Sequence, residues 1–135
     1  MAELTVETPK TLDCTIEVLF VDDATDQREL YERRLSRKGC RVRLAKSADE
    51  AATQVRRRRP DVVVLDIAMP GRDGLTALQE LLDIDPSLPV VIHTAYPAFA
   101  DNFLAWAADA YIEKSADLVP LLEAIETSVA REQRR

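Results

Sequence analysis

Short apolar segments alternate with amphipathic segments along most of this chain. Five segments are rich in β-branched and aliphatic residues and predict strands, at residues 17–21, 41–45, 61–65, 90–93 and 110–113. The segments between them carry apolar residues at helical spacing. Because strand and helix alternate, we expect parallel strands joined by right-handed crossovers. The pattern therefore predicts an α/β fold, with a doubly wound five-stranded parallel sheet and five helices.

Capping signals place the helix boundaries. Gly39 follows Lys38 and ends the first helix, and Ser47 with Glu50 has the spacing of a capping box that opens the second. The third predicted helix begins near Asp73 and ends before a proline. The last two predicted helices begin at Pro97, a favourable first helical position, and near Asp117.

Acidic residues stand directly after two of the predicted strands. Asp22 and Asp23 follow the first strand, and Asp66 follows the third. In doubly wound sheets ligands bind beyond the carboxyl ends of the strands, where Thr94 and Lys114 are also expected. Carboxylates gathered at one place repel each other, so their grouping predicts a bound cation. A hard dication such as Mg²⁺ prefers oxygen ligands of this kind.

Composition narrows the class of protein. The 135 residues match the common size of one domain. The net charge of −6 argues against nucleic-acid binding through bulk electrostatics. Cys14 and Cys40 are too few for a disulfide framework, so we expect reduced thiols. Without an apolar stretch of membrane-spanning length or a signal-peptide core, the sequence predicts a cytoplasmic protein with no membrane contact.

Four motifs, read in order, carry a family resemblance. They are FVDD at 20–23, LDIAMPGRDG at 65–74, HTA at 93–95 and YIEKS at 111–115. Together they make the chain similar to the response-regulator receiver domains of two-component signalling, over residues 16–129. The resemblance implies a flavodoxin-like sheet with strand order 2-1-3-4-5. Because residues 1–15 are polar and unpatterned, we expect a flexible N-terminal extension there, followed by a receiver domain at 16–131 and a C-terminal tail at 132–135.

The resemblance also implies a role for each residue of the site. Asp66 would be the phosphoacceptor, and Thr94 and Lys114 would contact the phosphoryl group. Thr94 and Tyr111 would act as a switch that alters the surface of the fourth helix, fifth strand and fifth helix. The implied Mg²⁺ ligands are Asp22, Asp23, Asp66 and the backbone carbonyl oxygen of Ala68.

The implied function is that of a phosphoacceptor. A histidine kinase or a histidine phosphotransfer protein would supply the phosphoryl group, and the altered surface would bind a second copy of the chain or a downstream protein. The chain would not be an enzyme beyond catalysing its own phosphorylation and dephosphorylation, and it would not bind nucleic acid directly. Two alternatives stay open: a Mg²⁺-dependent phosphohydrolase with an Asp nucleophile, and a receiver-like interaction module that is never phosphorylated.

Three further sequence features are a histidine within a strand, a serine after Lys114 and a run of arginines. His93 lies inside the fourth predicted strand, where a packed, neutral residue is expected rather than a ligand or base. Ser115 stands where the family usually has a proline, which leaves the geometry of the Lys114–Ser115 bond open. The arginine run at 56–59 is interpreted as the solvated end of a helix, whose dipole it complements.

Overall fold

The computed structural model describes residues 15–67, 74–95 and 107–133. Within these residues five parallel strands form one sheet, in the order β2-β1-β3-β4-β5. This order and the parallel pairing confirm the predicted sheet. The strands are β1 (Glu17–Val21), β2 (Arg41–Ala45), β3 (Val62–Leu65), β4 (Val90–Thr94) and β5 (Ala110–Glu113).

Four helices are present in the described part of the chain. They are α1 (Thr25–Arg37), α2 (Ala48–Arg57), α3 (Gly74–Ile84) and α4 (Val119–Gln133). The helix predicted to begin at Pro97 lies outside the described residues, so α4 is the helix predicted as the fifth. The start of α4 is two residues later than the predicted Asp117.

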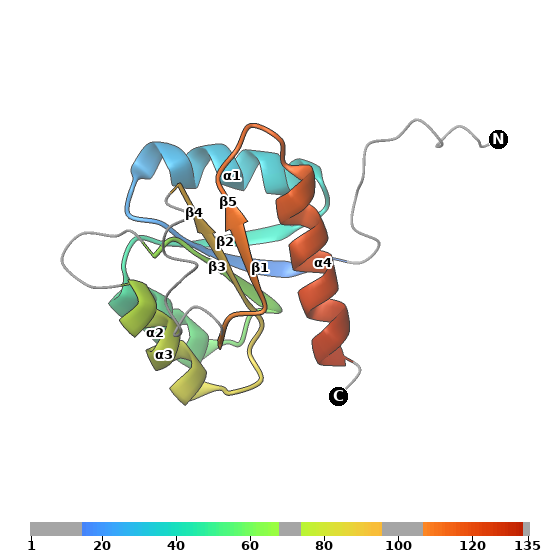
Figure 1. Cartoon of the computed structure of the whole chain (residues 1–135). Coiled ribbons are helices and arrows are strands. Elements are labelled where there is room, and N and C mark those ends of the chain that lie inside the picture. The colour runs from blue at the N-terminus through green and yellow to red at the C-terminus, as the bar shows by residue number, and fades with distance from the viewer. Residues whose placement is uncertain (1–14, 68–73, 96–106, 134–135) are drawn as a thin grey trace.

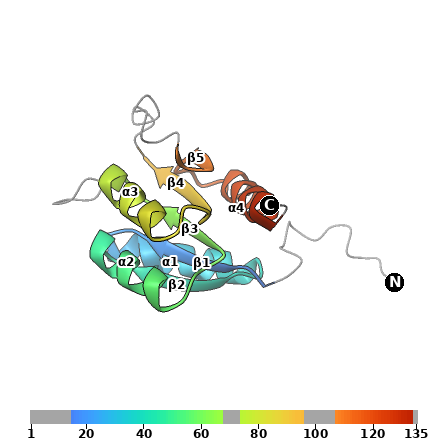
Figure 2. The same cartoon turned by 90° about the horizontal axis from the view of Figure 1, so that it is seen from below.

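The helices cover both faces of the sheet (Figures 1 and 2). On one face, α2 and α3 pack on apolar side chains such as Leu19, Val63 and Ile92. On the other, α1 and α4 pack on Phe20 and Val64. Successive residues of a strand point to opposite faces, so β1 and β3 supply both cores. Every residue of β3 is buried, as its uniformly apolar sequence predicts.

The register of the strands aligns their carboxyl ends. Val21 pairs with Leu65, and Leu65 pairs with Ile92 in β4. The next residue along β1 and β3 is therefore the first one past the sheet, and these two residues are Asp22 and Asp66. The parallel arrangement thus carries acidic residues from distant parts of the chain to one edge.

Two further sequence predictions concern membrane-spanning helices and the cysteine thiols. Among the described helices, none combines the length and apolar character that a membrane crossing requires. Cys40 is a buried free cysteine, and burial raises the pKa of its thiol to about 11. The Cys40 thiol is thus protonated at neutral pH, and Cys14 lies outside the described residues.

Local capping contacts agree with the sequence signals. Gly39 has a φ of 99°, a conformation that glycine adopts without a steric cost. The Ser47 hydroxyl accepts a hydrogen bond from the Glu50 backbone N–H at 3.1 Å. The Glu50 carboxylate in turn accepts one from the Lys46 N–H at 2.9 Å, which is displaced by one residue from an ideal capping box.

The Ser47→Ala substitution is expected to lower the free energy of unfolding by about 1 kcal/mol, because it leaves an N–H at the start of α2 without its partner. Urea unfolding at neutral pH measures the change. Ser36→Ala, on an exposed position of α1, is the matched control and should change stability by less than about half as much. Equal losses in the two variants would show that the Ser47 cap does not stabilise the fold.

Candidate functional site

Three carboxylates meet beyond the carboxyl ends of β1 and β3. Ligand atoms of Asp22, Asp23 and Asp66 all lie within 4.8 Å of one another. Asp22 is 1% exposed and Asp66 is 7% exposed, whereas Asp23 faces solvent. The structure therefore brings together the three acids that the sequence singled out.

Backbone hydrogen bonds hold the two buried acids in place. The Asp66 N–H donates to the Val21 carbonyl oxygen at 3.0 Å, which extends the β1–β3 pairing by one residue. Asp22 Oδ1 accepts a hydrogen bond from the Ala24 N–H at 3.0 Å. This contact turns the chain sharply from β1 into α1 and orients the Asp22 carboxylate.

Lys114 supplies the positive charge at this cluster. Its Nζ donates to Asp22 Oδ2 at 2.9 Å and to Asp66 Oδ2 at 3.1 Å. Burial opposes the charge on Lys114, but hydrogen bonds and Coulomb attraction from Asp22 and Asp66 outweigh it and raise the pKa of the amine. The described residues contain no cis peptide bond, so the Lys114–Ser115 bond is trans, and Lys114 still reaches both carboxylates.

The donor set fits a hard dication. Three carboxylates and one ammonium leave an excess of two negative charges in a largely buried place. Carboxylate oxygens at close range are ligands that Mg²⁺ accepts, while it keeps several waters in its shell. Ala68, whose carbonyl oxygen was predicted as a further ligand, lies outside the described residues.

Arg28 is a site residue that the sequence interpretation missed. Its Nη1 donates to the backbone carbonyl oxygen of Asp22 at 2.7 Å, and its Nη2 donates to Thr25 Oγ1 at 3.1 Å. The guanidinium thus ties the first turns of α1 to the loop that carries the acids. The sequence signal for this contact is a basic residue about one and a half helical turns past Asp23. Such a signal does not by itself identify a site residue.

Thr94 and Tyr111 occupy the neighbouring strands β4 and β5. Thr94 is the last residue of β4 and is fully buried, and its carbonyl oxygen accepts a hydrogen bond from the Lys114 N–H at 2.8 Å. Tyr111 lies in β5, paired with Ile92, and is partly buried against the core on the α2–α3 face. Their roles as phosphoryl contact and switch stay predictions.

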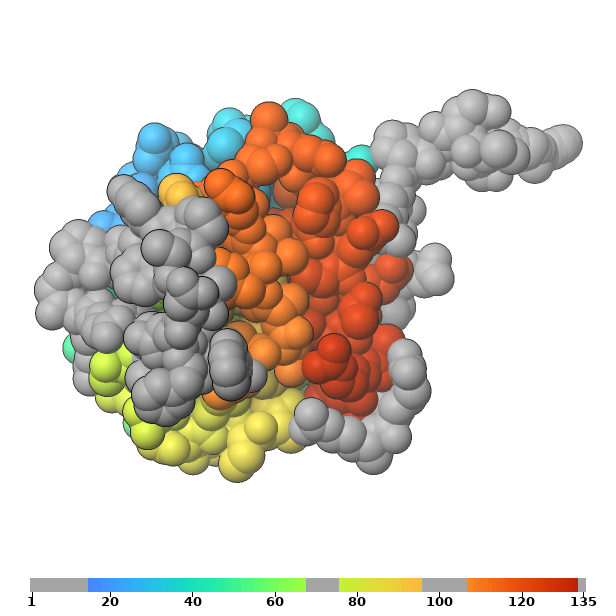
Figure 3. Space-filling model, viewed as in Figure 1, coloured from blue at the N-terminus to red at the C-terminus, as the bar shows by residue number. Residues whose placement is uncertain are grey.

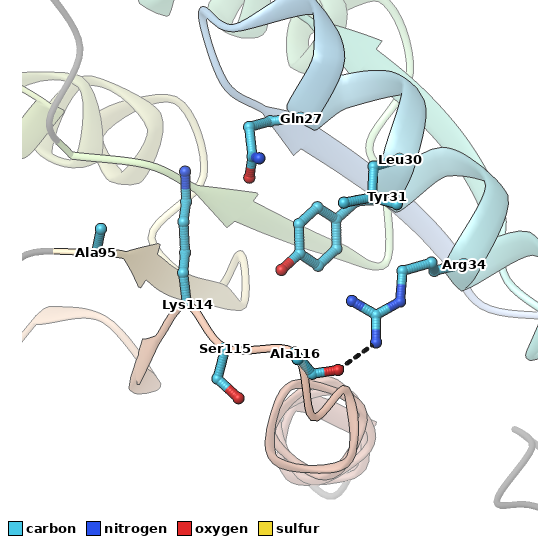
Figure 4. A pocket seen from close by; sticks show the side chains of 8 residues that line it. All are labelled: Gln27, Leu30, Tyr31, Arg34, Ala95, Lys114, Ser115 and Ala116. Carbon is cyan, nitrogen blue, oxygen red and sulfur yellow. Dashed lines mark hydrogen bonds between the residues drawn. The ribbon is translucent and has the colours of Figure 1, made fainter.

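A hollow opens beside Lys114, between α1 and the segment that follows β5 (Figure 4). Its volume is about 630 Å³, and Gln27, Tyr31 and Arg34 line its α1 side. Arg34 Nη2 donates to the Ala116 carbonyl oxygen at 2.7 Å and so joins the two walls. Lys114 is the residue that lines this hollow and also contacts the carboxylate cluster.

His93 precedes Thr94 but belongs to the core. Its ring is 2% exposed and makes edge contacts with Tyr31 and Phe20, at centroid distances of 4.9 Å and 6.1 Å. Burial lowers the pKa of His93 to about 4, and the charge of Lys114 acts in the same direction. The imidazole is therefore neutral at pH 7, which confirms the prediction of a packed, neutral residue.

Comparison of the sequence with known proteins gives a consistent result. The family model of the response regulator receiver domain matches residues 18–126. Response regulator MprA of Mycobacterium leprae (strain TN) is 37% identical over 116 residues, which cover 84% of this chain and 51% of MprA. The chain spans about half the length of the curated relatives that it matches.

Solved structures agree with this result. Response regulator protein TrrA of Thermotoga maritima, in complex with Mg²⁺-BeF, has a TM-score of 0.81 and 31% identity, and the match covers 84% of this chain and 99% of TrrA. A structure of histidine kinase ThkA in complex with TrrA gives a TM-score of 0.79 at 31% identity, over 84% of this chain and 98% of the matched chain.

The buried His93 predicts a loss of stability in mild acid. Its folded pKa of about 4 is below the unfolded value of 6.5, so the unfolded state binds the proton more tightly. The free energy of unfolding should therefore fall by up to about 3 kcal/mol as the pH falls from 6.5 to 4. Urea unfolding at several pH values in this window measures the effect.

The matched variants are His93→Phe and His93→Gln, neither of which titrates. Because carboxylates also respond to acid, the quantity to compare is the difference in unfolding free energy between wild type and variant at each pH. That difference should shrink or reverse in acid. A difference that stays constant from pH 7 to pH 4.5 would contradict a neutral, buried His93.

Proposed function

Because the chain belongs to the response regulator receiver family of two-component signalling, we propose that Asp66 accepts a phosphoryl group from a phosphohistidine donor. The observation that carries the proposal is the Lys114 Nζ lying between the carboxylates of Asp22 and Asp66. This cation at the mouth of a buried acidic cluster places positive charge where a phosphoryl group would add negative charge.

In the proposed reaction, one oxygen of the Asp66 carboxylate attacks the phosphorus. The new O–P bond forms as the P–N bond to the donor imidazole breaks, and the electron pair of that bond leaves with the imidazole. Phosphoryl transfer depends mainly on in-line positioning and on neutralising the charge of the phosphoryl oxygens. Lys114 contributes as a compact cation on a flexible stem. The Thr94 hydroxyl would donate a hydrogen bond to a phosphoryl oxygen.

The proposed Mg²⁺ site uses residues that already lie together. Asp22, Asp23 and Asp66 would hold the ion directly or through water, together with the backbone carbonyl oxygen of Ala68. When bound, Mg²⁺ supplies positive charge to the phosphoryl oxygens. Support comes from the acidic cluster and from TrrA, a structural neighbour solved with Mg²⁺-BeF.

The proposed output is a change in the surface on the β5 side. Drawing Thr94 towards the phosphoryl group would leave space for the ring of Tyr111 in the neighbouring strand. Figure 3 displays β5 and α4 as one continuous surface, and a hollow of about 320 Å³ lies between them. A second copy of the chain or a downstream protein would bind to the surface formed by β5, α4 and the segment predicted as the fourth helix.

The proposed donor is a histidine kinase or a histidine phosphotransfer protein. The hollow between α1 and the segment after β5 adjoins Lys114, and its mixed apolar and polar lining suits a protein surface. The structure of ThkA in complex with TrrA supports a kinase as the partner class. The comparisons do not favour the alternative of a phosphohydrolase with its own substrates.

Incubation with acetyl phosphate and Mg²⁺ is expected to add the mass of one phosphoryl group, because Asp66 is placed to attack phosphorus. Intact-mass spectrometry measures the adduct on wild type, on Asp66→Asn and on Asp83→Asn. Asp83 is an exposed acid on α3 and serves as the matched control, which should be modified like wild type. An equal adduct on Asp66→Asn, or no adduct on wild type, would contradict the proposal.

Mg²⁺ alone is expected to stabilise the fold, because it binds the three carboxylates in the native state only. At about a hundredfold excess over its dissociation constant, the gain is about 2.7 kcal/mol. Thermal unfolding with and without MgCl₂ measures it. Asp23→Asn, at the exposed acid of the cluster, should lose most of the gain, whereas Asp83→Asn should keep it. If Asp23→Asn keeps the whole gain, the ion binds elsewhere.

A further inference from the structure

The charges of this chain are strongly segregated. Residues 33–59 contain 11 basic and 2 acidic residues, a net charge of +9. The rest of the chain contains 7 basic and 22 acidic residues, a net charge of −15. The overall value of −6 therefore conceals one strongly basic segment.

The fold places this basic segment at one edge of the sheet. Residues 33–59 form the end of α1, the edge strand β2 and the helix α2. Figure 2 shows β2 and α2 together at the side of the sheet remote from β5, with α1 on the other face of the sheet. The basic residues of β2 and α2 thus lie at the opposite end of the strand order from β5, whereas Arg34 and Arg59 contact Ala116 and Glu132 on the α4 side.

Four arginines of this region form what we call the basic face: Arg41, Arg43, Arg57 and Arg58. Arg41 and Arg43 are two residues apart in β2, so both side chains lie on the same face of the strand. Arg43 contacts Gln54 of α2, which identifies that face as the one covered by α2. Arg57 and Arg58 stand at the end of the same helix.

A hollow of about 540 Å³ lies within the basic face. Its lining includes Arg43, Arg57 and Arg58, together with the polar side chains of Thr53 and Gln54. Glu50 is the acidic residue among those that line the hollow. Three guanidinium groups around one hollow present several N–H donors in fixed planes, an arrangement that matches carboxylate or phosphate oxygens.

Intramolecular ion pairs neutralise only part of this charge. Glu17 forms ion pairs with both Arg43 and Arg58. Within the described part of the chain, Arg41 and Arg57 have no carboxylate partner, and both are exposed. Arg43 Nε is buried and has no hydrogen-bond partner among the described residues. Arg41 and Arg57 therefore keep donors and charge that an external anion would satisfy.

The open edge of β2 offers little to an added strand. The side-chain amide of Gln54 donates to the Leu44 carbonyl oxygen at 2.7 Å, and so occupies one of the backbone acceptors that face outward. Arginine side chains on an edge strand also discourage strand addition. Recognition at this face would therefore use the side chains of arginine rather than a backbone ladder.

We propose that the basic face is a docking surface for an acidic polypeptide segment, whose carboxylates pair with the exposed Arg41 and Arg57. Charge complementarity is the basis for this occupant. A polypeptide segment can confine its carboxylates to a small area, which suits a face of a few arginines. This surface has no part in the proposed phosphoryl transfer, because it lies on the edge strand rather than beyond the carboxyl ends of β1 and β3.

A nucleic-acid duplex fits this face less well. A duplex carries one negative charge per about 1.7 Å along its axis and extends well past a surface of this size. The remaining net charge of −15 would oppose such binding.

The test uses a fluorescent peptide of about ten glutamates, with a glutamine peptide of equal length and a duplex of about 20 base pairs as comparison probes. Anisotropy at low and at physiological ionic strength measures binding to the full chain. We expect the glutamate peptide to bind, the glutamine peptide not to bind, and affinity to fall with salt. Asp66→Asn should bind the glutamate peptide like wild type, which separates this test from that of phosphorylation.

The decisive variants are Arg41→Gln/Arg57→Gln and its control Arg33→Gln/Arg37→Gln. Both remove two exposed arginines and change the net charge equally, but the control pair lies on α1. The first variant should weaken glutamate-peptide binding by about tenfold, and the control by less than about twofold. Equal weakening in both variants, tighter binding of the duplex than of the peptide, or no peptide binding at low salt would each overturn the proposal.

Discussion

The contact of Lys114 with Asp22 and Asp66 is the interaction on which this site depends. Two buried carboxylates at close range are unfavourable unless a cation lies between them, and the Nζ of Lys114 lies within 3.1 Å of both. Removing one member of a buried ionic group leaves the others uncompensated, so the three side chains act as a unit. The unit joins the ends of three different strands.

The parallel sheet is what makes this contact available. Parallel strands end at the same edge, and the register of β1 with β3 places Asp22 and Asp66 one residue past paired positions. The layers on both faces bury the strands, so the polar groups concentrate where the sheet stops. Buried charge is a poor source of stability, and its presence here is more simply explained by function than by folding.

Charge also divides the molecule on a larger scale. The acidic cluster lies beyond the carboxyl ends of the strands, whereas the basic face lies along the β2 edge. The net charge of the whole chain, −6, does not reveal this separation of acidic and basic regions. Arg57 and Arg58, from the arginine run interpreted as a solvated helix end, become part of a wider surface once β2 brings Arg41 and Arg43 beside them, whereas Arg59 pairs with Asp85 and Glu132.

The sequence by itself determined the strands, most helix boundaries and the identity of the acids, because periodicity and capping are local properties of the chain. It also predicted the sheet order through the family resemblance. Only the tertiary structure decided the contacts of Lys114, the anchoring of the Asp22 loop by Arg28 and the hollow at Arg43. These depend on side-chain paths between residues far apart in sequence, and no local pattern encodes such distances.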